Sequence, residues 1–513
     1  MIQKANEVKL NVLPFIASCE HLYYYEGPCR FGKGETLMPG FDRLANEQKA
    51  KVFLDALAEN APDGIHILEP FRFRRTDDWD NKEENWIAAA EAIAKADVIV
   101  ALAGIGCDDI VIELGDRFDT PIAMSPTAGF SILTESAALH AKVKERDINP
   151  FYRWSDLRYW LEIRRAKKVI NTTGILCATR FGKATSYSSA DAFNSYELIT
   201  ARLGVRFRFV NIHELLDQMS LATEGGNHTT PGRVTPNITA EELEEAGRMA
   251  DELMAGAQAV DIDRQYVINS IVAWMTVRKN MDLKDCCGFT APCPDTCSTR
   301  RVNEMKFTFC LTHSLNMEQG IPSACEFDTA AVLSQQALIA VSGKCPYMGN
   351  TAPVSYENGE FTSRALERVS EANLEKLKAN PENLYWMHHS VAHRRIADPN
   401  VEAPYALRHF AYDQKFGATL RYDFDADEGK KITMCRFSPD GSKLFIALGE
   451  IVCGGGYENN NCTQKVIFRV NDQMDTFRKQ SYAGNHCSLV YGDYAQKLAD
   501  LAESLGIEAV VAK

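Results

Sequence analysis

The first third of the chain alternates short apolar runs with segments in which apolar residues recur at helical spacing. These patterns predict strands at Lys9–Ala17, Gly64–Leu68, Asp97–Ala103 and Thr120–Met124, and helices at Phe41–Ala58 and Glu83–Ala96. Strands that alternate with helices are typical of a parallel sheet covered on both faces.

A second region of the same kind begins near Lys167. The pattern predicts a strand at Lys168–Thr172, a helix at Asp191–Leu203 and a strand at Val205–Asn211. Thr239 and Glu242 then form a capping signal for a helix that runs to Met254, because a Thr followed three residues later by Glu satisfies two free amide groups. The Gly- and Thr-rich segment before it, Thr223–Thr235, is typical of an irregular loop.

The last third is rich in strand-like runs. Strands are predicted at Lys430–Phe437, Lys443–Ile451, Cys462–Val470 and Glu508–Ala512, and a helix at Tyr494–Leu505 that Gly506 ends. The sequence Ser-Pro-Asp-Gly-Ser at 438–442 predicts a turn between the first two strands. We therefore expect an α/β protein with two Rossmann-like, doubly wound parallel-sheet domains, 1–166 and 167–345, followed by a β-rich, barrel-like domain, 346–513.

Composition narrows the class of protein. The chain is 45% hydrophobic and 24% charged, as in folded globular proteins, and its formal charge of −13 argues against a nucleic-acid partner. The basic stretch Phe71–Arg75 is interpreted as a solvated loop, because aspartates follow it. The longest apolar run, Val98–Cys107, is far shorter than the roughly 20 residues of a membrane-spanning helix. The absence of a secretory pattern and 15 scattered cysteines predict reduced thiols and a cytoplasmic location.

Two motifs suggest chemistry but have simpler explanations. Gly104-Ile105-Gly106 follows a predicted strand, yet Asp109 stands where a dinucleotide-binding motif has its third glycine, so helix capping is the better interpretation. The cysteines 286, 287, 293 and 297 lack the paired Cys-x-x-Cys spacing of most zinc modules. Free thiols packed near a buried site are the favoured interpretation, and a structural zinc site is the alternative.

Three other segments carry candidate metal ligands. Glu326 lies between an apolar segment predicted as a strand, Phe307–Leu311, and a predicted helix, Thr329–Val341, and α/β folds place ligand sites at such strand-to-helix junctions. A carboxylate beside helix amide groups stays ionised and can bind a hard cation, although an ordinary acidic helix cap is the alternative. His486 lies in a Gly-Asn-His turn before a strand-like run.

The third segment, Trp386–His393, holds three histidines and is followed by two arginines. His388, His389 and His393 could supply a metal ligand or an acid–base group, and Arg394 and Arg395 could help to hold an anionic substrate. A solvated surface strip is the alternative interpretation of this segment.

Together these segments resemble the L-fucose/L-arabinose isomerase superfamily, most clearly over the C-terminal 200 or so residues. The run Gly-Ile-Pro-Ser-Ala-Cys-Glu-Phe-Asp at 320–328 resembles the family motif with the first metal-binding glutamate, which maps onto Glu326. Gly484-Asn485-His486 with Val490-Tyr491-Gly492-Asp493 resembles the motif with the metal-binding histidine, which maps onto His486. Asn485 matches a residue that contacts the sugar in the fucose branch.

One position departs from the family pattern. The family places a second acid, a metal ligand and candidate base, where this chain has Asn350. An amide oxygen can still ligate Mn²⁺ or Mg²⁺, but it takes no proton near neutral pH. The arabinose branch has a further histidine ligand, for which His388 is our choice, with His389 assigned to substrate binding.

The resemblance implies a metal-dependent enzyme that interconverts an aldose and a ketose through an enediol. In this hypothesis Glu326 ligates the metal and carries the proton, His486 is a ligand, Asn350 and His388 complete the shell, and Asp328 supports it. It also implies Mn²⁺, with Mg²⁺, Co²⁺ or Fe²⁺ as alternatives, and a homo-oligomer, hexameric or trimeric. The alternatives are an epimerase or lyase acting on a modified sugar, which Asn350 favours, and a catalytically inactive sugar-binding relative.

Overall fold

The computed structural model describes residues 2–23, 38–76, 82–104, 107–126, 145–180, 194–221, 237–293, 296, 300–362 and 364–513. The chain divides into two compact units. The small unit is Val8–Arg165, and the large unit combines Met1–Glu7 with Ala166–Lys513. The predicted regions 167–345 and 346–513 therefore belong to one compact unit.

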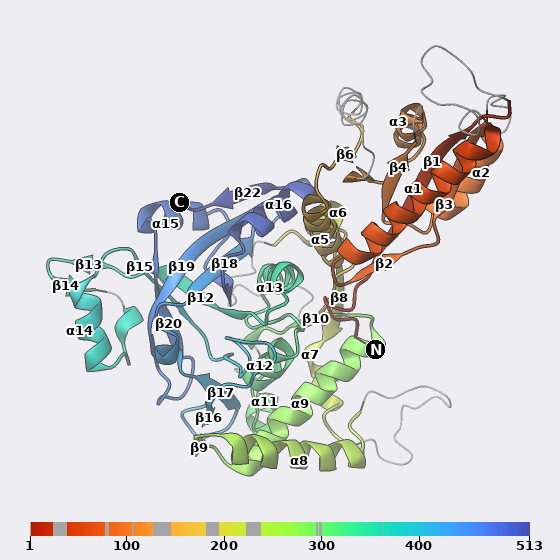
Figure 1. The fold of residues 1–513 in the computed structure, drawn as a ribbon. Coiled ribbons are helices and arrows are strands. Elements are labelled where there is room, and N and C mark those ends of the chain that lie inside the picture. The colour runs from red at the N-terminus through yellow and green to blue at the C-terminus, as the bar shows by residue number, and fades with distance from the viewer. Residues whose placement is uncertain are drawn as a thin grey trace. The chain divides into compact units, whose positions relative to one another are not determined.

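The small unit contains a parallel sheet in the order β2-β1-β4-β5-β6, with β3 also paired to β1 (Figure 1). Alternate residues of β1 enter different apolar clusters: Leu13 and Phe15 pack with α2 and α3, and Val12 and Ile16 pack with α1 and α5. Helices therefore cover both faces of this sheet. Its elements are β1 (Leu10–Glu20), α1 (Pro39–Asn60), β2 (Ile65–Ile67), β3 (Phe71–Thr76), α2 (Lys82–Ile93), β4 (Val98–Ala103), α3 (Asp108–Arg117), β5 (Ile122–Met124), β6 (Ile148–Pro150) and α5 (Trp154–Asn171).

Strand β3 corrects the sequence interpretation of the basic stretch. Phe71–Arg75 is not a loop but pairs in parallel with Phe15–Cys19 of β1. The side chain of Phe73 is buried, while Arg72 and Arg74 lie on the surface and both contact Glu47. The alternation of aromatic and basic residues is thus the pattern of a half-buried strand.

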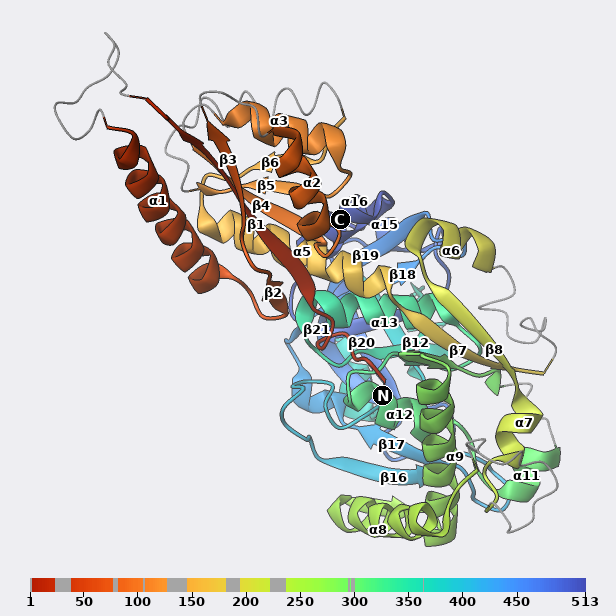
Figure 2. The same ribbon diagram turned by 90° about the vertical axis from the view of Figure 1, so that its right-hand side faces the viewer.

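The first part of the large unit contains a second parallel sheet, in the order β11-β10-β7-β8. In both ribbon views α8 and α9 lie side by side near this sheet (Figure 1 and Figure 2). The capping box predicted at Thr239 and Glu242 is confirmed at the start of α8. The elements are β7 (Gly174–Thr179), α6 (Tyr196–Leu203), β8 (Arg206–Asn211), α7 (Ile212–Asp217), α8 (Ala240–Gly256), α9 (Arg264–Leu283), β10 (Gly288–Thr290), α11 (Arg300–Met305), α12 (Cys310–Glu318), β11 (Ser323–Ala324) and α13 (Thr329–Ser342).

Two predicted strands of this region are wrong. Lys168–Thr172 forms the end of helix α5 and the turn after it, and the strand begins only at Gly174. Phe307–Leu311 leads into helix α12, which begins at Cys310. Both segments are short and apolar, and a short apolar run cannot be assigned to a strand or a buried helix from its pattern alone. The predicted loop Thr223–Thr235 lies outside the described residues.

The C-terminal part forms a closed six-stranded barrel, which confirms the predicted β-rich, barrel-like region. Its strands follow the order β18-β21-β12-β15-β20-β19, every pair is antiparallel, and β19 pairs back with β18. Strand β22 (Glu508–Val511) adds to β19 in parallel. The barrel strands are β12 (Tyr347–Pro353), β15 (Leu384–His388), β18 (Lys431–Phe437), β19 (Lys443–Gly455), β20 (Lys465–Val470) and β21 (His486–Tyr491).

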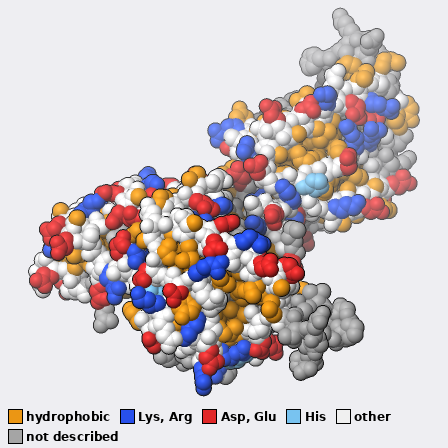
Figure 3. Space-filling model, turned by 90° about the horizontal axis from the view of Figure 1, so that it is seen from below, with side chains coloured by type: hydrophobic (Ala, Val, Ile, Leu, Met, Phe, Trp, Pro, Cys, Tyr) orange, Lys and Arg blue, Asp and Glu red, His pale blue; other side chains and the backbone are white. Residues whose placement is uncertain are grey.

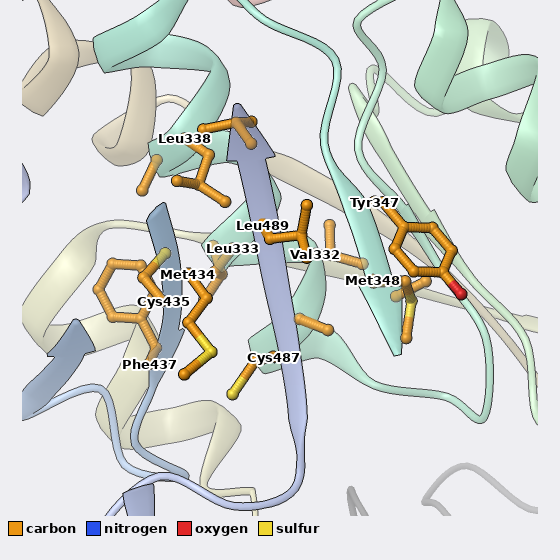
Figure 4. Close-up of a cluster of buried hydrophobic side chains, with 14 of the residues drawn as sticks. Val332, Leu333, Leu338, Tyr347, Met348, Met434, Cys435, Phe437, Cys487 and Leu489 are labelled. Atoms are coloured by element: carbon orange, nitrogen blue, oxygen red, sulfur yellow. The ribbon is translucent and has the colours of Figure 1, made fainter. Parts of the chain in front are cut away.

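Helix α13 packs against the barrel strands β18 and β21. The close-up in Figure 4 shows Val332, Leu333 and Leu338 of α13 beside side chains of β12, β18 and β21, and all of these belong to one buried apolar cluster. Burial of this surface fixes the N-terminus of α13 against the barrel, and therefore fixes the residues just before it.

The remaining elements surround the barrel. Strand β16 pairs with β17 on one side and with β9 on the other, and the three form a small separate sheet. These elements are β9 (Ala259–Asp261), β13 (Tyr356–Glu357), β14 (Glu360–Phe361), α14 (Glu371–Ala379), β16 (Tyr405–His409), β17 (Ala418–Tyr422), α15 (Gln473–Gln480) and α16 (Ala495–Leu505), with short 3-10 turns at Arg364–Leu366 and Phe424–Asp427.

On the face shown in Figure 3, acidic and basic side chains are interspersed, and hydrophobic side chains form groups between them. None of the described helices combines the length and the apolar character that crossing a membrane requires.

Candidate metal centre

Three side chains from distant parts of the large unit meet at the edge of the barrel. A carboxylate oxygen of Glu326 lies 3.5 Å from His389 Nε2, and the other lies 3.4 Å from His486 Nε2. Among the described residues, this is the one group of three or more His, Cys, Asp or Glu side chains whose ligand atoms lie close enough to share an ion. Both Nε2 atoms are buried and have no hydrogen-bond partner in the described part of the chain. The group thus offers one carboxylate and two imidazoles to a common point.

Glu326 reaches this point through an unusual backbone turn. It lies between β11 and α13, and both Glu326 and Phe327 have a φ of 58°, in the left-handed region. Each such non-glycine residue costs of order 1 kcal/mol or more, so the surrounding packing must hold it there. Phe327 is fully buried, and its amide donates to the carbonyl of Ala291 over 2.9 Å. The buried ring therefore holds the strained turn that presents the Glu326 carboxylate.

Asp328 links helix α13 to the barrel. Its Oδ1 accepts the amide of Ala331 over 2.8 Å and so caps the helix. Its Oδ2 lies 2.9 Å from His486 Nδ1 and 2.7 Å from Nη1 of Arg436. The side chains of Asp328, His486 and Arg436 are almost completely buried. The Arg436 guanidinium and the His486 ring hold the pKa of Asp328 well below its usual range, although burial alone would raise it.

The contact with Asp328 fixes the tautomer of His486. An ionised carboxylate can only accept, so Nδ1 carries a proton and Nε2 is the nitrogen left to bind a metal. Nε2 faces Glu326, and a carboxylate behind a histidine is the usual support of a metal-binding imidazole. His486 is thereby prepared as a ligand.

The turn before His486 depends on glycine. Gly484 has a φ of 117°, and a side chain there would meet Nε of Arg436. The close approach lets Arg436 bond the carbonyls of Ala483 and His486 as well as Asp328. The Gly-Asn-His pattern seen in the sequence therefore reflects a buried arginine beneath the turn.

His389 has the opposite arrangement of its ring nitrogens. Its Nδ1 accepts the backbone amide of Ser390 over 3.1 Å, which places the ring proton on Nε2. Nε2 then donates toward Glu326 rather than offering a lone pair. The backbone of His389 is fixed by Tyr347, whose hydroxyl accepts the amide of His389 over 2.9 Å and lies 3.2 Å from its carbonyl. His389 is thus arranged as a hydrogen-bond donor.

The electrostatics keep Glu326 ionised. Burial raises its pKa, but the interactions with the nearby His389 and His486 outweigh burial and lower the pKa to about 2. A carboxylate that stays charged at neutral pH is a suitable ligand for a divalent cation.

No protein-family model matches the chain, and no curated protein matches it. The geometry of this group and its surroundings is therefore what bears on function.

The barrel register aligns three residues that the sequence analysis singled out. Asn350 on β12 is paired with His486 on β21 and with His388 on β15. Directly paired residues project from the same face of a sheet, so the three side chains form one row. The Asn350 Oδ1 accepts from Asn485 over 2.6 Å. The two asparagines predicted for the site thus contact each other beside His486.

His388 and His389 differ in position although they are adjacent in sequence. His388 ends strand β15, and its ring stacks on Trp386 with centroids 4.5 Å apart. Burial lowers the pKa of His388 to about 4, so the ring is neutral. His389 follows the end of the strand and joins Glu326 and His486, whereas the histidine ligand predicted from the sequence is His388.

Other candidate residues lie elsewhere. Arg394 forms ion pairs with Glu318 and Glu402, so its charge is already matched. Every cysteine in the described part of the chain is a free thiol, and Cys297 lies outside that part. Ile105 and Gly106 of the glycine motif also lie outside the described residues, while Asp108 begins helix α3.

Sequence reasoning missed Arg436 and Tyr347. Both side chains are almost completely buried, and each contacts a residue of the site. Arg436 lies in β18, where most other residues are buried and apolar. A charged residue within an apolar strand is the signal that points to Arg436, because a buried charge requires a partner.

Proposed function

We propose that this chain is a metal-dependent sugar enzyme that interconverts an aldose and a ketose through an enediol. The observation that carries the proposal is the arrangement of His486, whose proton is held on Nδ1 by Asp328 while its unpartnered Nε2 faces the Glu326 carboxylate. The resemblance of the two motifs around these residues to the L-fucose/L-arabinose isomerase superfamily supports the same reaction.

The residues present fit a divalent cation. Glu326 and His486 would hold it, and Asn350 supplies a neutral amide oxygen from the adjacent strand. Imidazole and oxygen ligands suit Mn²⁺, and also Mg²⁺, Co²⁺ or Fe²⁺. When bound, such a cation polarises the carbonyl and hydroxyl oxygens of a sugar and makes the neighbouring C–H proton easier to remove.

Two side chains of the protein then have separate roles in the reaction. His389 Nε2–H donates a hydrogen bond to a sugar oxygen, and Glu326 carries the proton between C1 and C2. The pKa of Glu326 is lowered partly by its interaction with the nearby His389. When Nε2–H of His389 turns to the substrate instead, Glu326 loses part of this stabilisation and becomes more basic.

The neutral side chain of Asn350 favours a second candidate reaction. It cannot serve as a second base, so the same site could instead catalyse epimerisation or bond cleavage of a modified sugar. The two reactions differ in their products, since only the first yields a matched aldose–ketose pair.

The proposal includes two features expected from the sequence pattern: Rossmann-like, doubly wound topology for the two parallel-sheet regions, and a cytoplasmic location. It also includes a hexameric or trimeric homo-oligomer, which the resemblance implies.

The Glu326→Gln variant tests the proposal, with Glu402→Gln as its control. Glu402 contacts Arg394 and Arg395 and is not part of the metal-ligand group. We expect E326Q to lose bound Mn²⁺ and to lose exchange of solvent deuterium into C1 or C2 of a sugar substrate, and E402Q to keep both. Unchanged metal content and exchange in E326Q would falsify the assignment. Metal and sugar binding without exchange in the wild type would indicate the inactive sugar-binding alternative.

The two histidines give a second test. Because the ring proton of His389 lies on Nε2, His389→Gln should retain most Mn²⁺ affinity and lose turnover. His486→Gln should lose Mn²⁺ affinity. Equal loss of metal in both variants would contradict the separation of roles.

A further inference from the structure

A second buried charge lies close to the candidate metal centre and has no counter-charge. Arg421 on β17 is completely buried. Its Nη2 donates to the carbonyl of Asn461, but Nε and Nη1 have no hydrogen-bond partner within the described residues. None of the described carboxylates forms an ion pair with it. Burial lowers its pKa only to about 10, so Arg421 remains charged at neutral pH.

The place of Arg421 in the sheet shows that packing does not explain it. Leu407 and Leu420 point from β16 and β17 into the apolar cluster that includes residues of α9 and α12. The register pairs Arg421 with Ala406 and Thr419 with Arg408, so Arg421 and Arg408 project from the other face. Arg408 on that face is satisfied by Glu458 and by the carbonyl of Tyr457. Among the described residues, Arg421 has the Asn461 carbonyl as a partner but no carboxylate.

A short chain of contacts joins Arg421 to the metal-ligand group. Asn461, which accepts from Arg421, is followed by Cys462, and the Cys462 thiol lies 3.3 Å from the Ser390 hydroxyl. The amide of Ser390 bonds His389 Nδ1. Arg421 also lowers the pKa of Tyr347, the tyrosine that holds the backbone of His389, although burial of Tyr347 raises that pKa more. Asn461, Cys462 and Ser390 therefore connect the guanidinium to His389.

The charges of this region do not cancel. The Asp328 carboxylate is balanced by Arg436, and Asn350 is neutral. Glu326, Arg421 and a divalent cation then leave a net charge of about +2 in a buried environment. An unpaired buried charge is costly, and a ligand of opposite charge can remove that cost.

We propose that the substrate of this site carries an anionic group, and that Arg421 is the residue that selects for it. This inference rests on the proposed function, because it places the anionic group on the sugar that binds at Glu326 and His486. The shared chemistry is an oxyanion that accepts two N–H groups of a guanidinium: a carboxylate, a phosphate or a sulfonate. A neutral sugar would leave the Arg421 charge unpaired.

The first experiment uses simple anions as probes. Acetate, phosphate and sulfate are titrated into the Mn²⁺-loaded protein at constant ionic strength, with chloride as the reference, and binding is measured by calorimetry and by the shift in Tm. We expect at least one of the three to bind the wild type and to raise its Tm. In Arg421→Met the affinity should fall by at least about tenfold, since a charge-assisted hydrogen bond is lost. Which anion binds best distinguishes the three groups.

Arg408→Met is the matched control, because Arg408 lies on the same face but is already paired. It should change anion affinity little. Without added anion, R421M should be at least as stable as the wild type, since an apolar side chain of similar length replaces an unpaired charge. A large drop in Tm or failure to fold in R421M would show a structural role and overturn the proposal. So would the absence of any specific anion binding to the wild type.

A second experiment tests selection on sugars. Neutral hexoses and their uronate, 6-phosphate and 6-sulfonate counterparts are compared by kcat/KM in the wild type and in Arg421→Lys. We expect the wild type to prefer a charged sugar and R421K to reduce that preference, because lysine keeps the charge but not the two-pronged geometry. A preference of the wild type for neutral sugars would overturn the inference. If the wild type did not bind Mn²⁺ at all, the proposed function would be overturned instead.

Discussion

The Nδ1 atom of His486 lies 2.9 Å from the same Asp328 oxygen that Arg436 contacts at 2.7 Å. One carboxylate oxygen therefore serves an imidazole and a guanidinium, while the other caps helix α13. The helix, two barrel strands and the candidate ligand His486 are joined through a single side chain. Changes at Asp328 should consequently affect both metal binding and stability.

The Asp328→Asn variant should show weaker metal binding and lower stability. Asparagine keeps an oxygen for the helix cap but presents its NH₂ group to two donors, Arg436 and His486. We expect Mn²⁺ affinity to fall by about 10- to 100-fold. The free energy of unfolding should fall by about 3–5 kcal/mol, because the buried Arg436 loses its counter-charge. Calorimetric titration and urea denaturation measure the two effects.

The control is Asp472→Asn. Asp472 also caps a helix, α15, because its Oδ1 accepts a hydrogen bond from the backbone amide of Asp475 over 2.9 Å, and it is not among the metal-ligand residues. A similar loss of metal affinity in both variants would mean that helix capping, rather than the contact with His486, accounts for the effect.

Replacing Asn350 by Asp should strengthen metal binding. The new carboxylate would stand in the row between His486 and His388 and add a negative charge to the ligand set. We expect Mn²⁺ affinity to rise by about tenfold, because affinity for hard cations grows with the number of charged oxygen ligands. Asn485→Asp is the control, because Asn485 is exposed and lies next to Asn350. Equal affinities of N350D and the wild type would show that position 350 does not reach the ion.

The hydroxyl of Tyr347 should contribute to stability and to the position of His389. Tyr347→Phe removes one of the two acceptors of the His389 amide and leaves the Gln464 carbonyl as the other, which should lower the free energy of unfolding by about 0.5–1.5 kcal/mol and reduce kcat more than Mn²⁺ affinity. Tyr385 on β15 is a matched control, since its buried hydroxyl has no partner among the described residues. Tyr385→Phe should leave the stability unchanged or raise it. If Tyr385→Phe were less stable than Tyr347→Phe, this role of the Tyr347 hydroxyl would be contradicted.

His393 should make the protein acid-sensitive. Burial lowers its pKa to about 4, and its Nε2 donates to the carbonyl of Pro346 over 3.0 Å. Between pH 6.5 and 4 the unfolded chain binds a proton at this ring and the folded protein does not. Stability therefore falls as the pH falls through this window, by roughly 3 kcal/mol for this one group.

His393→Gln tests the acid sensitivity, because glutamine cannot take up the proton. Urea denaturation at pH 7 and pH 4.5 should show a smaller loss of stability in the variant than in the wild type. Equal losses would show that His393 does not contribute to the acid sensitivity.

The sequence was most informative where one pattern dominates. Val98–Ala103 is a strand because a nearly continuous apolar run fits a sheet buried on both faces, and the capping box at Thr239 is local chemistry. Lys168–Thr172 was misassigned because the end of an amphipathic helix has the same short apolar pattern as a strand. The pattern of a segment does not show how far a neighbouring helix extends.

The site was predictable in part for the same reason. Glu326 and His486 stand in motifs that depend on local backbone, a strained turn and a glycine turn. The choice between His388 and His389 depends on where strand β15 ends, which is decided by its pairing with β12 and β20. Arg421 could not be connected with the site at all, since its contact runs through the distant Asn461.

The closed barrel also bears on when the protein can acquire an ion. Strand β21, which carries His486, pairs with β18 on one side and β12 on the other, and Glu326 is positioned by a helix that packs on this strand. A partly assembled chain lacks the meeting point of the two side chains. Metallation should therefore follow folding rather than guide it, and a nascent or refolding chain would not sequester metal before the ring of strands is complete.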